Sequence, residues 1–160
     1  MPRRNCYALK KFSEAERIAD EIGFYGAAAN AAVSTATAAA RNGDLPHASE
    51  ACSRARDEFT RTGDSLGLCE CLKIEGVIER ERENYSIAET ILREAMCLFS
   101  ECENPLGVAE SEYELSLAYA AAGKGADALN SVNAARLKFE ALEAVADVVR
   151  CDKLLSKLLA

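Results

Sequence analysis

The sequence lacks an excess of basic residues: 26 Asp and Glu stand against 19 Lys and Arg, which gives a net charge of −7. Proteins that bind nucleic acid normally carry a basic footprint, and anionic membrane surfaces attract basic segments. No apolar run approaches the ~18–20 residues that span a bilayer. Lys10, Lys11 and Glu14 also interrupt the stretch where a signal peptide would have its apolar region. We therefore expect a cytoplasmic chain with no nucleic-acid or membrane partner.

The residues and motifs of catalysis are equally scarce. His47 is the only histidine, and it lies beside Pro46 at an expected helix start, so any Ser/His/Asp or Cys/His arrangement would depend on it. No GxxxxGK[ST] or GxGxxG motif occurs, so nucleotide binding has no support. We predict a protein that is not an enzyme, with no catalytic residues and no cofactor.

The seven cysteines form no metal-binding pattern. Their odd number, without a secretory signal, favours reduced thiols in a cytosolic protein. Cys69 and Cys71 are two residues apart on an expected helix and point to nearly opposite sides, so they cannot grip one ion as a CxxC turn does. Cys52 and Cys69 fall at helix-packing positions, where a thiol behaves as a small apolar group. We predict no metal site.

Alanine, by contrast, is abundant, and tryptophan is absent, with prolines reduced to three. Together with Leu, Glu, Lys and Arg this favours helices throughout. Placing the chain over itself with an offset of forty aligns three packing columns, which on a helix share one face. These columns are Ala8, Ala48, Ala88 and Ala128; Ala15, Ala55, Ala95 and Ala135; and Phe59, Phe99 and Phe139, with Ala19 in the first copy.

Helix punctuation recurs between these columns. Gly43 and Gly63 are each followed by Asp, as expected for a helix stop and a new N-cap, and Asn104-Pro105 is an N-cap with proline at the first helical position. The sequence thus predicts an all-α fold of about eight helices joined by short turns. Their expected ranges are 5–22, 24–42, 45–62, 65–83, 85–102, 105–122, 125–142 and 145–159.

The spacings Gly43…Ala48…Ala55 and Gly123…Ala128…Ala135 resemble the tetratricopeptide repeat (TPR) family. The period of forty is similar to that of the longer repeats in bacterial regulators and signalling proteins. HEAT and armadillo arrays share a period near forty, but the Gly–Ala–Ala spacing favours the tetratricopeptide type. The resemblance implies a right-handed α-solenoid of stacked antiparallel helix hairpins.

On this basis we expect one domain over residues 1–160, with repeats at 24–62, 64–102 and 104–142. The helices 5–22 and 145–159 would cap the array, because each has one apolar and one polar side. This favours a self-contained array. The expected apolar sides are Ala8, Phe12, Ala15, Ile18, Ala19 and Ile22 in the first helix and Val148, Cys151, Leu155, Leu158 and Leu159 in the last.

In the tetratricopeptide family, partners lie in a concave groove lined by the first helix of each repeat. The resemblance therefore implies a set of partner-binding candidates, of which Tyr113 is the best anchor because exposed aromatics often dominate binding. Lys73 and Asn30 each match one residue type of the Lys, Asn and Arg set with which some members of the family bind a C-terminal carboxylate. The full set is Asn30, Val33, Thr37, Glu70, Lys73, Val77, Arg80, Glu110, Tyr113, Leu117, Arg150 and Lys153.

Three functions remain open from the sequence. The first is a protein-interaction module, a scaffold or regulatory adaptor, that holds a partner peptide or helix in its groove. The second is a sensor domain for a peptide or small ligand in a signalling or transcription regulator. The third is a structural module that forms homo-oligomers through its end helices.

Overall fold

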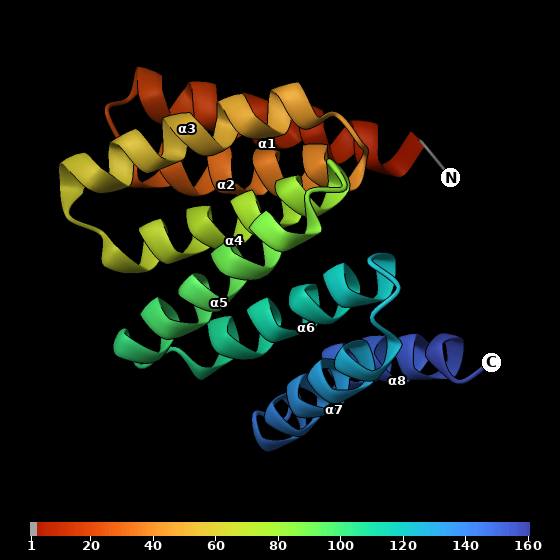
Figure 1. The fold of residues 1–160 in the computed structure, drawn as a ribbon. Helices are drawn as coiled ribbons and strands as arrows, with labels where there is room; N and C mark the ends of the chain where they lie inside the picture. Colours follow the sequence, from red (N-terminus) through yellow and green to blue (C-terminus); the bar gives the residue numbers. More distant parts are fainter. Residues whose placement is uncertain (1–2) are drawn as a thin grey trace. The chain divides into compact units, whose positions relative to one another are not determined.

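In the computed structural model, the described part of the chain is residues 3–160, without the side chains of residues 3–6, 8 and 20. These residues form eight α-helices and no strand (Figure 1), so the predicted all-α class is confirmed. Every predicted helix end lies within two residues of the observed one. The helices are α1 (Arg3–Glu21), α2 (Tyr25–Arg41), α3 (Leu45–Thr62), α4 (Ser65–Glu81), α5 (Tyr85–Glu101), α6 (Pro105–Ala121), α7 (Gly125–Ala141) and α8 (Val145–Leu158).

The helices belong to two compact units. Unit 1 ends at Arg82 and holds α1–α4, and unit 2 begins at Glu83 and holds α5–α8. Within each unit every helix packs against the next along the chain, and α2 also contacts α4. Short turns between helices of 14 to 19 residues make these neighbours antiparallel hairpins.

The turns repeat every twenty residues with one backbone device. Each has a residue with positive φ one or two positions after the helix end. In at least six of the seven turns the amide of the next residue bonds back into the last helical turn, as in Asp64 N to Phe59 O at 2.9 Å. This is the Schellman pattern, which satisfies carbonyls that the helix end leaves unpaired. The positive-φ residues are Gly23, Gly43, Gly63, Glu83, Glu103, Gly123 and Glu143.

The predicted alanine and phenylalanine columns form the core of α3, α5 and α7. Phe59, Phe99 and Phe139 are fully buried, as are the alanines of the two columns on these three helices. A Cβ on Gly67 would overlap the ring of Phe59, and one on Gly107 would overlap the ring of Phe99. Glycine at these two positions thus lets each ring lie directly on the backbone of the following helix.

The predicted apolar side of the first helix is partly wrong. Ala15, Ile18 and Ile22 are exposed, whereas Glu16 is buried beside Ala19. The corresponding faces of α3 and α7 pack against the helix that precedes each of them, α2 or α6, and α1 has no such neighbour among the described helices. Ala8 lies outside the described side chains.

The last helix needs one correction. Leu159 follows the end of α8 and is 72% exposed, so it does not belong to the apolar side. Leu154 is buried instead, and together with Cys151 it packs into a core cluster that also contains Val132 and Phe139 of α7. The sequence misplaced Leu159 because a helical pattern does not show where the last turn ends.

Candidate partner-binding faces

All twelve predicted partner-binding residues lie on α2, α4, α6 and α8, and none is fully buried. Asn30 and Lys153 are exposed, and the other ten are partly exposed. They divide into an α2–α4 face in unit 1 and an α6–α8 face in unit 2. The two faces are described separately below.

On the α2–α4 face the polar groups are largely engaged within their own helices. The amide of Asn30 donates to the carbonyl of Gly26 at 2.9 Å, and the Lys73 ammonium lies 2.8 Å from the Glu70 carboxylate. Val33 and Val77 pack against the buried core of unit 1. Because the Asn30 and Lys73 groups already have partners, this face offers little for binding a terminal carboxylate.

The α6–α8 face presents an aromatic ring with a cation above it. The guanidinium of Arg150 lies 4.9 Å from the centre of the Tyr113 ring and 2.7 Å from the Asp147 carboxylate. Tyr113 and Leu117 pack partly against the core, so their exposed edges are held in place. A fixed aromatic beside a cation is suited to apolar, aromatic or acidic groups of a peptide.

A polar network that the sequence analysis missed joins three elements of unit 2. The Tyr119 hydroxyl donates to Glu89 at 2.6 Å and accepts from Arg93 at 2.8 Å, while Lys124, at the start of α7, lies 3.2 Å from Glu89. The hydrogen bond from Tyr119 lowers the pKa of Glu89, and burial raises the pKa of Tyr119. Only the four-residue spacing of Glu89 and Arg93 is visible in the sequence, because Tyr119 is thirty residues from Glu89 and on another helix.

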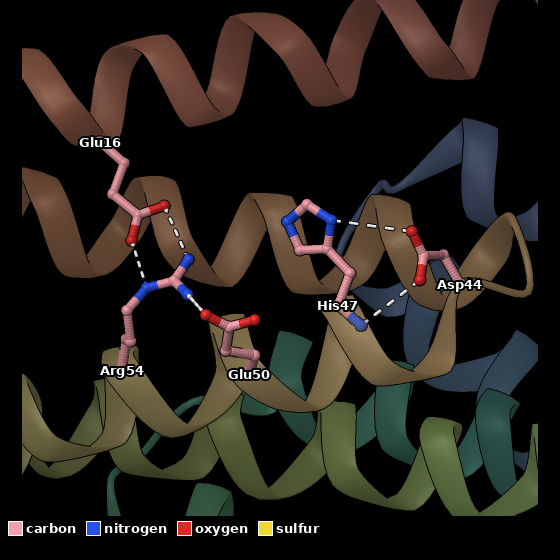
Figure 2. A network of polar contacts seen from close by, with 5 residues as sticks. All are labelled: Glu16, Asp44, His47, Glu50 and Arg54. Atoms are coloured by element: carbon pink, nitrogen blue, oxygen red, sulfur yellow. Dashed lines mark hydrogen bonds and ion pairs between the residues drawn. The ribbon is translucent and has the colours of Figure 1, made fainter.

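Unit 1 has a second network, drawn in Figure 2, which connects α1 to α3. Arg54 donates two hydrogen bonds to Glu16, from Nε at 2.9 Å and from Nη2 at 3.3 Å, and a third to Glu50 at 3.0 Å. At the start of α3, the N-cap residue Asp44 accepts a hydrogen bond from the backbone amide of His47, and its carboxylate lies 3.7 Å from the His47 imidazole. His47 therefore contacts the N-cap of its own helix, as a residue in a first helical turn does.

Two surface hollows lie outside the predicted residues. One, of about 270 Å³, is lined by Glu16, Ala28, Ala29, Ala32, Arg54, Asp57 and Glu58, and the other, of about 470 Å³, by Ser100, Glu103, Asn104, Pro105, Val108 and Lys138. Ala28 and Val108 are eighty residues apart, as are Glu58 and Lys138, so the two units have hollows at related positions. Both hollows are open to solvent, and they are lined by different types of residue.

Among the described side chains, which leave out Cys6 and Asp20, no group of three or more His, Cys, Asp or Glu residues is arranged to hold a metal ion. Residues 3–160 contain no helix with the length and apolar character needed to cross a bilayer.

Comparison with known proteins returns no match, either to a protein-family model or to a curated protein.

Proposed function

We propose that this chain is a protein-interaction module of the tetratricopeptide type that holds a partner peptide or helix on the α6–α8 face of unit 2. The observation that carries the proposal is the α6–α8 face, where Tyr113 and Arg150 form a partly exposed aromatic–cation pair on a packed core. A surface already rigid before binding loses little entropy when a ligand docks. The short turns, which recur every twenty residues, and the buried Ala–Ala–Phe columns support the assignment to the tetratricopeptide type.

The side chains of the α6–α8 face indicate which kind of peptide would bind there. The Arg150 guanidinium can donate hydrogen bonds to a carboxylate of the partner, although Asp147 already neutralises part of its charge. The Tyr113 edge and Leu117 add apolar contact area next to it. We expect bound peptides to combine an apolar or aromatic residue with an acidic one.

A random peptide library displayed on phage and selected on the immobilised full chain tests this function. We expect enriched peptides to bind in fluorescence anisotropy and Tyr113→Ala to weaken them at least about tenfold, the loss typical of an interface anchor. Leu137→Ala is the matched control, because Leu137 is 64% exposed on α7 and lies outside both faces.

Two results would contradict the proposal. One is equal weakening by Tyr113→Ala and Leu137→Ala. The other is a selection that enriches no peptide while a low-molecular-weight metabolite mixture raises the melting temperature, which would favour the small-ligand sensor instead.

A further inference from the structure

Two cysteine side chains meet in the core of unit 1. Cys52 on α3 and Cys71 on α4 belong to one buried cluster, with 1% and 0% of their surfaces exposed. The Cys52 Sγ lies 3.4 Å from the carbonyl oxygen of Cys71, so the thiol of one residue sits against the other residue. Nineteen residues and the α3–α4 turn separate them in the sequence, which is why the cysteine spacing did not reveal the pair.

The two thiols differ in acidity because they interact. A hydrogen bond from the Cys52 thiol lowers the pKa of Cys71, whereas the same hydrogen bond, with burial, raises the pKa of Cys52. The Arg56 guanidinium favours the thiolate at both positions, while Glu70 and Asp64 oppose it at Cys71. Of the two thiols, Cys71 is therefore the one that loses its proton more readily.

The side chains of Arg56 and Glu75, next to Cys52, are charged and partly exposed. Arg56 of α3 forms an ion pair with Glu75 of α4, and the two side chains are 44% and 28% exposed. Glu75 Oε1 lies 4.0 Å from Cys52 Sγ, so the ion pair is directly next to the thiols. Both side chains are partly exposed, so we expect opening of this pair to cost less than unfolding the unit.

We propose that Cys52 and Cys71 are a redox modification site that forms a reversible disulfide between α3 and α4 in the presence of a hydroperoxide. The Cys71 thiolate attacks the O–O bond of hydrogen peroxide, which gives a Cys71 sulfenic acid and, after proton uptake, water. Cys52 then attacks the sulfenic sulfur, and its proton leaves with the displaced hydroxide as a second water. Two thiols and one peroxide thus become one disulfide and two waters.

Unit 2 provides an internal control for this chemistry. Eighty residues after Cys52 and Cys71 stand Val132 and Cys151, which are both fully buried in the same core cluster. Cys151 has no second thiol at the matching position, and burial raises its pKa to about 11. Cys151 should therefore remain reduced under conditions that oxidise Cys71.

The test uses the full chain with Cys6, Cys97 and Cys102 replaced by serine, so that only the buried cysteines remain. The folded protein is treated with hydrogen peroxide, free thiols are blocked in denaturant, and intact mass and linked peptides are measured. We expect a loss of two mass units, a Cys52–Cys71 linked peptide, and full reversal by dithiothreitol. Cys52→Ala should abolish the linkage, whereas Cys69→Ala should leave it unchanged.

The V132C variant adds a gain-of-function arm that does not depend on removing a core residue. We expect it to form a second linkage, between position 132 and Cys151. The proposal is overturned if the Cys52–Cys71 linkage is absent from a chain whose circular dichroism is native. It is also overturned if the linkage forms no faster than the chain unfolds in the same buffer, since that would mean that the native pair is inaccessible.

Discussion

Units 1 and 2 have the same order of helices and nearly the same helix lengths, yet they fill their cores differently. Residues eighty apart occupy corresponding positions, so α1 corresponds to α5 and α2 to α6. Two buried residues of unit 1 are much smaller than their counterparts in unit 2: Ala39 corresponds to Tyr119, and Ala19 corresponds to Phe99. The backbone repeat therefore tolerates either filling, because the alanine columns and the turns are common to both units.

The turns also differ between the units, and here unit 1 has the more favourable residues. The three turn residues with positive φ in unit 1 are glycines, whereas three of the four in unit 2 are glutamates. A side chain in the left-handed region costs roughly 1–2 kcal/mol. Unit 2 therefore combines larger side chains at these two core positions with less favourable turns, and unit 1 has the reverse combination.

The largest expected effect comes from moving the Ala19 side chain of unit 1 into unit 2. Phe99→Ala should lower the free energy of unfolding by about 3–5 kcal/mol, because it opens a cavity over Gly107. Urea denaturation, with hydrogen exchange to locate the loss in α5 and α6, measures it. Leu137→Ala should change stability by less than about 0.5 kcal/mol. A small loss at Phe99 would mean that side-chain volume is not what separates the units.

The next effect concerns the ion pair that unit 1 has and unit 2 lacks. Arg54→Ala leaves the Glu16 carboxylate, 12% exposed, without its two hydrogen bonds, and should cost about 1–3 kcal/mol. Glu50→Ala, at the 74% exposed partner in the same network, should cost less than about 1 kcal/mol.

The corresponding residues of unit 2 supply the rescue. Met96 and Ala134 stand where unit 1 has Glu16 and Arg54, so Glu16→Met combined with Arg54→Ala should recover most of the stability lost by Arg54→Ala alone. A double variant as unstable as the single one would show that the site requires a charge pair for packing.

A turn substitution should raise stability. Glu143 has a φ of 55°, so Glu143→Gly removes backbone strain and should add about 1 kcal/mol, measured by thermal and urea unfolding. Gly43→Ala in unit 1, where φ is 78°, should lose a similar amount. If Glu143→Gly gives no gain, the glutamate side chain stabilises the turn in a way that offsets the strain.

The smallest expected effect is the pH dependence of the Tyr119–Glu89 hydrogen bond in unit 2. The hydrogen bond from Tyr119 lowers the pKa of Glu89, so the folded state binds the proton less readily than the unfolded chain. This stabilisation is complete above the unfolded-state pKa, near 4.3, and is lost as the pH falls through the lower folded-state value.

Melting temperatures between pH 7 and pH 3 measure this dependence. Glu89→Gln should flatten the acid decline, by an amount worth less than about 1 kcal/mol. Glu94→Gln, an exposed carboxylate on the same helix, is the matched control. Equal curves for the two variants would contradict a specific role of the Tyr119 network. Unit 1 has Leu9 at the corresponding position and therefore has no equivalent of this network.

The helices, their limits and the buried columns could be predicted from the sequence, because these depend on local propensity, turn residues and a regular spacing of apolar positions. The sequence also identified twelve surface positions on the even-numbered helices, although their partner stays a prediction. Its errors were at the two ends, where Ile22 and Leu159 obey the helical pattern but meet no neighbouring helix.

The contacts between side chains of different helices could not be predicted from the sequence. The Cys52–Cys71 contact, the Glu16–Arg54 ion pair and the Tyr119–Glu89 hydrogen bond join residues that are 19, 38 and 30 positions apart. Such contacts depend on the rotation of each helix about its axis and on side-chain rotamers. A one-dimensional repeat specifies which side of a helix is buried, but it does not specify which atom of the neighbouring helix lies opposite.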